Sequence, residues 1–415
     1  MTQHDTQLAS QARQNTRGEV PFDFRECFYS RTDQRGVILS GNDVFRRISG
    51  FEWSELLKAP HKLVRHPDMP RGAFHLKWER LKAGHPTAVY VKNRAKDGRY
   101  YWVLAAVWPV DDGYLSIRIK PSTPLFEKVR DIYAEVLAEE ADGLSPEDGH
   151  ASIVAHIRAL GYSDYDAFQA DALTQECAAR AARLGEPQDA AQRRFGLMQA
   201  AIDDIRTETE QMTESFKAIR TVPMNMRILA SRLENAGGPI SAISVNYGSM
   251  LDEMANWVRD FVDGDDSAFV RIRGSIVNGA FLTCLASVQS MMATSFAQSR
   301  HQDMGGVDVD TEQRILTQEA EKYKANAAQA LKVVETGAGR LSRSVLDMKR
   351  YVTGLSSTRM MCKIESASLS GSGDSLAGIV EQLDACQDEI ESRLSKIVER
   401  NTVIQSNTSM LRALT

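Results

Sequence analysis

The chain has 415 residues, with 50 Lys and Arg against 55 Asp and Glu, which gives a net charge of −5. A net acidic chain gives no indication of nucleic-acid binding or of a polybasic membrane anchor. Hydrophobic residues make up 43% and charged residues 25%, a balance that excludes wholesale disorder. The five cysteines lie far apart and form no CxxC pair, so we expect inert thiols in a reducing, cytoplasmic compartment.

The first third of the chain predicts a short lead followed by a small α+β domain. Residues 1–21 are polar, lack the apolar core of a secretory signal and are expected to be disordered. Between residues 22 and 121, β-type runs alternate with glycine turns and short helical stretches. The expected strands are at residues 36–39, 87–93, 100–108 and 114–120. We therefore expect an antiparallel sheet with short helices, of the size of a sensor domain.

Residues 122–186 are expected to form a helical spacer. Amphipathic stretches at residues 123–141 and 165–184 predict helices, and Gly185-Glu186-Pro187 marks the end of the spacer. Further along, Gly274 to Ser299 is uncharged but rich in Ser, Thr, Asn and Gln. We expect a helix buried among other helices there rather than a membrane span.

Residues 187–415 predict a coiled-coil or helical-hairpin bundle. Apolar residues recur every seven residues from Ile205 to Leu233, and a second stripe of the same spacing runs from Ile240 to Phe261. Gly237-Gly238-Pro239 lies between the stripes, so we expect a hairpin tip near 237–239. Pro223 is expected to kink the first arm. Two more stripes follow, separated by a predicted Ser- and Gly-rich linker at Ser366–Gly378.

Such stripes have to be buried on each other or on a second chain, so we expect a homodimer.

The most distinctive polar cluster lies between Pro60 and Pro70. Because prolines fix the backbone on both sides, Arg65, His66 and Asp68 are expected to face a common ligand, with two donors beside one acceptor. The side chains expected to complete a pocket for a flat ligand with polar edges are two amides and two indole rings, namely Asn42, Asn93, Trp78 and Trp102. The alternative is a loop stabilised by its own salt bridge.

Residues 22–121 contain an ordered series of motifs: Gly41-Asn42-Asp43-x-Phe45, Val64-Arg65-His66-Pro67-Asp68-Met69-Pro70, Lys77-Trp78, Val91-Lys92-Asn93-Arg94 and Tyr100-Tyr101-Trp102-Val103. In these motifs the segment resembles the PAS domain of bacterial aerotaxis receptors. That family holds FAD non-covalently and reports redox or oxygen status. The resemblance implies FAD contacts at Arg65, His66 and Asp68, with Asn42, Trp78 and Asn93 next.

Thr87 stands where the family usually has a tryptophan, which leaves two alternatives open. One is a haem-binding PAS domain, in which His61, His66 or His75 would be the axial ligand. The other is a PAS domain without a cofactor, acting as a dimerisation module on a scaffold.

The segment from Val222 to Glu234 resembles, less closely, the arm near the tip of chemoreceptor signalling hairpins. This resemblance implies binding to the chemotaxis kinase and its coupling protein, through Arg227, Arg232 and Glu234. The sequence contains no Walker A loop, no Gly-x-Ser-x-Gly and no paired histidines on one helix face. We therefore expect no enzyme activity and no metal site, and the predicted function is an aerotaxis-type signal transducer.

Overall fold

The computed structural model describes residues 18–231, 237–262, 267–298, 307–368 and 373–413. The chain forms two compact units. Unit 1 contains Met1–Gln192 and Val277–Ala327, and unit 2 contains Arg193–Ile276 and Ala328–Thr415. Two helices, α11 (Ala268–Gln298) and α12 (Val309–Ser368), contribute residues to both units.

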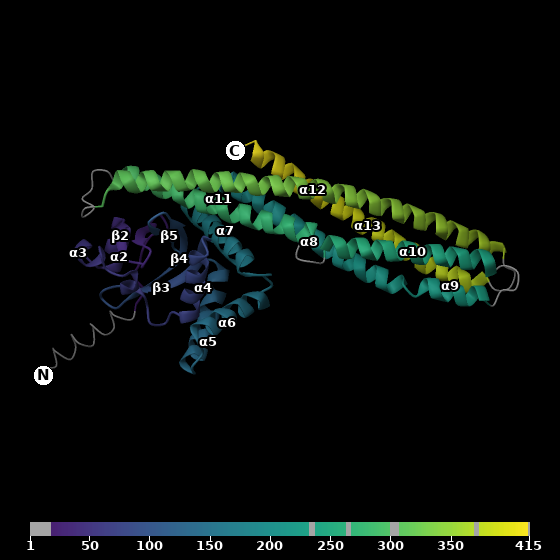
Figure 1. The fold of residues 1–415 in the computed structure, drawn as a ribbon, viewed down its shortest axis with the longest axis horizontal. Helices are drawn as coiled ribbons and strands as arrows, with labels where there is room; N and C mark the ends of the chain where they lie inside the picture. Colours follow the sequence, from purple (N-terminus) through teal and green to yellow (C-terminus); the bar gives the residue numbers. More distant parts are fainter. Residues whose placement is uncertain (1–17, 232–236, 263–266, 299–306, 369–372, 414–415) are drawn as a thin grey trace. The chain divides into compact units, whose positions relative to one another are not determined.

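Unit 1 is built on a five-stranded antiparallel sheet in the order β2-β1-β5-β4-β3 (Figure 1). The strands are β1 (Phe28–Asp33), β2 (Ile38–Gly41), β3 (Thr87–Arg94), β4 (Tyr100–Val110) and β5 (Gly113–Ile119). At the turn between β1 and β2, Gly36 has a φ of 78°, a left-handed conformation that favours glycine. The expected antiparallel sheet with short helices is confirmed, and the sheet also contains β1, which the sequence analysis did not predict.

One face of the sheet lies beneath the short helices between β2 and β3. These are α2 (Asp43–Ser49), α3 (Trp53–Leu56), the 3-10 helix η1 (His61–Val64) and α4 (Arg71–Lys82). Asn42 caps α2: its Oδ1 accepts from the amides of Phe45 at 3.2 Å and Tyr29 at 3.0 Å, and its Nδ2 donates to the Cys27 carbonyl at 2.7 Å. These bonds tie the start of α2 to β1.

The opposite face of the sheet is covered by helices from distant parts of the chain. The predicted helices at residues 123–141 and 165–184 are present as α5 (Pro124–Ala141) and α7 (Tyr165–Leu184), with α6 (Pro146–Ala159) between them. Aromatic contacts join this face to α5, α11 and α12; the pairs are Trp102 with Phe126 at 5.3 Å, Tyr29 with Phe296 at 4.9 Å, and Trp108 with Tyr323 at 6.3 Å. Helices α5 and α7 therefore pack on the sheet, whereas α6 packs on α4.

Helix α11 is the one helix among the described residues that is long and apolar enough to cross a membrane. However, 72% of its most apolar 18-residue window is buried in the fold. A core helix passes the same length and composition test, so the burial agrees with the helix expected at Gly274–Ser299.

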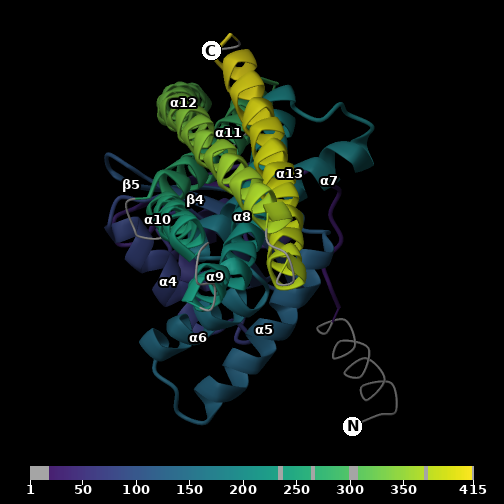
Figure 2. The same ribbon diagram turned by 90° about the vertical axis from the view of Figure 1, so that its right-hand side faces the viewer.

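Unit 2 is helical. It contains α8 (Ala190–Ile219), which begins in unit 1, α9 (Val222–Ser231), α10 (Gly237–Val262), parts of α11 and α12, and α13 (Gly373–Arg412). Figures 1 and 2 show these helices running alongside one another. The helix breaks at Arg220–Thr221, and Pro223 lies in the first turn of α9, where its missing amide hydrogen costs little. Of the predicted linker at Ser366–Gly378, residues 366–368 belong to α12 and residues 373–378 to α13, while residues 369–372 lie outside the described part of the chain.

The heptad stripes are buried within this single chain. Five residues of the stripes are completely buried, namely Ile205, Met212, Met226, Leu341 and Ile397. A second chain is therefore not needed to bury these stripes, and the homodimer stays a prediction.

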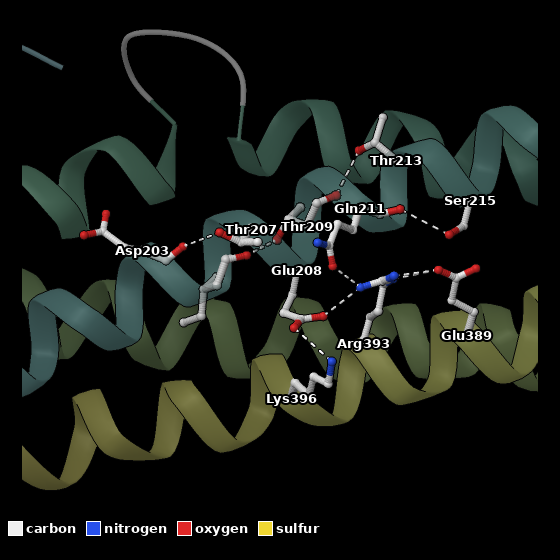
Figure 3. A network of polar contacts seen from close by, with 11 residues as sticks. Asp203, Thr207, Glu208, Thr209, Gln211, Thr213, Ser215, Glu389, Arg393 and Lys396 are labelled. Atoms are coloured by element: carbon white, nitrogen blue, oxygen red, sulfur yellow. Dashed lines mark hydrogen bonds and ion pairs between the residues drawn. The ribbon is translucent and has the colours of Figure 1, made fainter. Parts of the chain in front are cut away.

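A network of charged side chains clamps α8 to α13 inside unit 2 (Figure 3). The guanidinium of Arg393 donates to Glu208 at 3.1 Å and to Glu389 at 2.6 Å, and it also meets Gln211. Lys396 reaches the second oxygen of Glu208 at 3.1 Å. Arg393 and Glu208 are both largely buried, so their geometry is fixed by packing.

Candidate cofactor site

A cavity of ≈ 390 Å³ lies between the sheet and α4. This volume falls in the range of small-molecule sites, about 300–1,000 Å³. Its walls come from β1, β3, β4 and β5 on one side and from α4, η1 and the β1–β2 turn on the other. The residues used below are Ser30, His61, Arg65, Phe74, Lys77, Trp78, Val91, Asn93, Ala105, Val107, Tyr114, Ser116 and Arg118.

The alternation of side chains along each strand decides which residues reach the cavity. On β5, Tyr114, Ser116 and Arg118 face the cavity, while Leu115 and Ile117 face the helices on the other side of the sheet. Val91, Ala105 and Val107 supply the apolar part of the floor. On this polar face of β5, Ser116 and Arg118 are buried against the cavity and Tyr114 is partly exposed.

Aromatic rings on α4 form the wall opposite the sheet. Trp78 packs edge-on against Tyr114, with ring centroids 5.1 Å apart. The Arg65 guanidinium lies 3.9 Å from the centre of the Phe74 ring, and the Lys77 ammonium lies 4.5 Å from that of Trp78. These cation–π contacts hold both cations at the cavity wall.

The cavity is cationic: among the described residues, none that lines it is acidic. Arg118 Nη2 donates to Ser30 Oγ at 2.6 Å and to His61 Nε2 at 2.7 Å. Because a guanidinium only donates, Nε2 of His61 accepts and that ring is neutral. Burial, with the nearby cations Arg118 and Lys77, holds the pKa of His61 well below its usual value.

Burial and the charges of Arg118 and Arg65 lower the pKa of Lys77 to about 7, and burial lowers the pKa of Arg118 to about 10. Two polar atoms at the cavity, Ser116 Oγ and Arg118 Nη1, are buried without a hydrogen-bond partner in the described part of the chain. Unpaired buried donors of this kind are costly, and a ligand with acceptor atoms would satisfy them.

Three of the seven residues predicted to contact a cofactor line the cavity, namely Arg65, Trp78 and Asn93. Arg65 has an extended backbone and forms a bridge to Asn93 of β3, which places both side chains at the same wall.

The other four lie outside the cavity. Next along the extended backbone from Arg65, His66 points to the opposite side, and its Nδ1 lies 3.5 Å from the Asp68 carboxylate, which pairs with Lys92 at 2.6 Å. Asn42 is used as the cap of α2, and Trp102 lies on the other face of the sheet against Phe126. The structure therefore does not place all seven side chains around one cavity, as the sequence analysis had expected.

The remaining predicted residues are placed as follows. Of the three histidines considered as haem ligands, His61 alone lines the cavity, and its Nε2 is occupied by Arg118; His75 lies at the contact with α6. Arg227 is exposed on α9, whereas Arg232 and Glu234 lie outside the described residues.

Four cavity residues were not selected by sequence analysis, namely Ser30, Lys77, Ser116 and Arg118, and His61 was considered only as a haem ligand. The polar–apolar alternation of β5 was the available signal, but it is also the pattern of a strand with one face in water. Only the position of α4 over that face distinguishes the two cases.

Part of the chain is similar to known proteins. Residues 38–115 match the PAS fold family. The aerotaxis receptor of Escherichia coli (strain K12) is 38% identical over 123 residues, which cover 28% of this chain and 24% of that protein. A solved light-oxygen-voltage domain, studied with a flavin analogue, is 20% identical, covers 28% of this chain and 84% of that one, and has a TM-score of 0.21.

The sheet with its short helices is therefore a PAS domain, followed by a mostly helical region. Its similarity to the aerotaxis receptor is confined to 123 residues. The match spans about a quarter of the receptor's length, so the activity of the whole receptor does not transfer with it.

Proposed function

We propose that this chain is a cytoplasmic redox or oxygen sensor whose PAS cavity holds a flavin, and that the flavin is FAD. The single observation that carries the proposal is the cavity itself, which combines aromatic walls with a cationic, hydrogen-bonding edge. An isoalloxazine ring is flat and presents carbonyl and ring-nitrogen acceptors along one edge. The unpaired donors at Ser116 and Arg118 suit such an edge.

Particular residues would hold the ring. Trp78 and Phe74 offer flat apolar surfaces, and the amide of Asn93 can donate and accept at the edge. When bound, a flavin supplies reversible uptake of electrons and protons. The protein's part is to position the ring, exclude water and keep His61 neutral beside Arg118, so that this pair can respond to a change in the ring's hydrogen-bonding edge.

Strand β1 offers a route from the cavity to the helices. Ser30 faces the cavity, while its neighbours Tyr29 and Arg31 face the opposite side and bind Glu312 near the start of α12. Burial and the Glu312 carboxylate raise the pKa of Tyr29, so its hydroxyl stays protonated and donates to Glu312. Helix α12 then continues into unit 2. We propose that displacement of β1 is passed to α12 in this way.

The partner surface proposed for the output is one end of unit 2, where α9 and α12 end and α10 begins (Figure 1). Large apolar side chains are exposed on these helices, namely Met224, Ile228, Val245, Met360, Met361 and Ile364. Exposed apolar patches of this kind are typical of interaction surfaces. By the resemblance to chemoreceptor hairpins, the proposed partners are the chemotaxis kinase and its coupling protein, together with a second copy of this chain.

The flavin proposal is tested by the visible absorption spectrum of the purified full chain. We expect the bands of oxidised flavin, either as isolated or after reconstitution with FAD. Lys77 is one of the cations that line the cavity, and we propose that it donates a hydrogen bond to the flavin. Lys77→Met should then weaken FAD binding on the order of 10- to 100-fold, because a hydrogen bond from a charged group contributes about 1.5–3 kcal/mol. The matched control is Lys82→Met, an exposed position on the same helix. A protein that stays colourless with excess FAD would support the cofactor-free scaffold instead.

The partner proposal is tested separately by binding of the full chain to purified kinase and coupling protein. Ile228→Glu should reduce binding, whereas Leu346→Glu, at another exposed apolar position elsewhere in unit 2, should not. Equal binding by both variants would contradict the proposed surface.

A further inference from the structure

Helices α4 and α6 cross at unusually short range within unit 1. A Cβ atom added to Gly72 would lie 2.4 Å from the carbonyl carbon of Gly149, so only glycine fits there. The start of α4 is held by Glu140, whose carboxylate accepts from the amides of Arg71 at 2.8 Å and Gly72 at 2.7 Å. The relative position of the two helices is therefore fixed by backbone contact as well as by side-chain packing.

This crossing brings together two histidines that are 75 residues apart. His75 lies one turn after Gly72 on α4, His150 follows Gly149 on α6, and their Nδ1 atoms are 3.4 Å apart. Glu79, one turn further along α4, places its Oε2 3.1 Å from Nδ1 of His150. The nearest ligand atoms of all three residues lie within 4.8 Å of one another.

These separations match the edges of a tetrahedral coordination shell. Two atoms bound to a zinc ion at ~2.0–2.1 Å and at the tetrahedral angle lie ~3.3–3.4 Å apart. The His75–His150 separation of 3.4 Å has this length, and the His150–Glu79 separation of 3.1 Å is slightly shorter. Two imidazoles and one carboxylate are also a ligand set that transition metals prefer.

The surroundings of the cluster favour a cation. Arg80, which follows Glu79 on α4, makes its ion pair with Asp166 and not with Glu79. Half-burial keeps both imidazoles in place, while the Glu79 side chain is 60% exposed and leaves a path for an ion to enter. Another histidine on α6, His156, contacts a single carboxylate, that of Glu135, at 3.6 Å. This is an ordinary ion pair, whereas His150 contacts both a carboxylate and a second imidazole.

We propose that His75, Glu79 and His150 form a binding site for a divalent transition-metal ion of the zinc class, with the fourth position open to water. The ion joins α4 to α6. Phe74, Lys77 and Trp78 lie beside His75 and Glu79 on α4 and line the PAS cavity, so the metal would stiffen the helical wall of the cavity. The site is independent of the flavin proposal, because none of its three ligands lines the cavity.

The test uses the full chain without an affinity tag, stripped with a chelator and titrated with ZnCl₂ by calorimetry. We expect one ion per chain. Substitution by CoCl₂ should give the visible absorption bands of tetrahedral cobalt.

His150→Ala should weaken Zn²⁺ binding by at least the ~10–100-fold that loss of an outer-shell partner costs, and His75→Ala should do the same. The matched control is His156→Ala on the same helix, which should bind Zn²⁺ as the unaltered chain does.

Glu79→Gln guards against misfolding, because this exposed side chain can change without loss of packing, and it should still weaken Zn²⁺ binding. Far-ultraviolet circular dichroism of each variant checks that the helices remain. The proposal is overturned if the unaltered chain binds no Zn²⁺, or if folded His75→Ala, His150→Ala and Glu79→Gln variants bind it as tightly as His156→Ala does.

Discussion

Replacement of Glu312 by alanine tests the connection between the sheet and α12. The Glu312 side chain is 2% exposed; its Oε1 accepts from Arg31 Nη2 at 2.8 Å, and the Tyr29 hydroxyl donates to its Oε2. The variant leaves the Tyr29 hydroxyl and part of the Arg31 guanidinium buried without this partner. Arg31 keeps a second ion pair, with Asp112 at 2.6 Å.

The expected loss in the free energy of unfolding is about 3 kcal/mol. Breaking a buried ion pair by removing one partner costs roughly 3–5 kcal/mol, and the retained Asp112 contact favours the lower end. Asp112→Ala is the control, since Asp112 is 59% exposed and a surface ion pair contributes only ~0–1 kcal/mol. The double variant Arg31→Met with Glu312→Met removes both charges and should be less destabilised than the two single changes added together.

The assay is urea unfolding followed by tryptophan fluorescence. Four of the five tryptophans lie in unit 1, namely Trp53, Trp78, Trp102 and Trp108, so the signal mainly reports the unit that contains this contact. If Glu312→Ala is no less stable than Asp112→Ala, or if the double variant equals the sum of the single ones, the buried ion pair does not hold α12 to the sheet.

Three further predictions concern the stability of the fold. The pKa of His61 is lowered in the fold, so at mildly acidic pH the unfolded chain binds a proton that the folded chain does not. The free energy of unfolding should therefore fall as pH decreases from about 7 to 5, by up to ~1.4 kcal/mol per pH unit, and His61→Gln should flatten this dependence in a pH series. Gly72→Ala should destabilise unit 1 by about 1–3 kcal/mol in urea unfolding, because its methyl group meets Gly149, and an unchanged midpoint would refute the close crossing. Arg393→Ala should lower the melting temperature of unit 2 more than Lys396→Ala does, because its guanidinium is more deeply buried; equal shifts would contradict this.

The elements predictable from sequence are those set by local periodicity. The heptad stripes and the Pro223 break appear in unit 2, and the turns between β-type runs mark β3, β4 and β5. A repeat of two or seven residues depends on the local sequence alone, so it can be recognised without knowing which distant segments pack against it.

The candidate site was only partly predictable, because contacts between distant segments decide it. Arg65 lines the cavity and His66 does not, since the backbone is extended at Arg65 and consecutive side chains there point to opposite sides. Trp102 was predicted to form a wall of the ligand pocket because of its residue type. Side chains alternate along β4, however, and Trp102 lies on the opposite face of the sheet, where it packs against α5. The His75–His150 pair lies on two helices, so a search for histidines along one helix face does not find it.

Strand β1 gives the sensor proposal its physical basis. Its side chains alternate, so the segment that holds Ser30 against Arg118 also holds Tyr29 and Arg31 against Glu312. A change in the hydrogen bond between Ser30 and Arg118 that displaces the strand therefore also displaces Tyr29 and Arg31 on its opposite face. The pairing of β1 with β2 shifts register between Arg31 and Thr32, and such an irregularity lets a strand bend locally without losing its neighbours. The shift lies beside the residue that binds α12, which is where a displacement has to be absorbed or passed on.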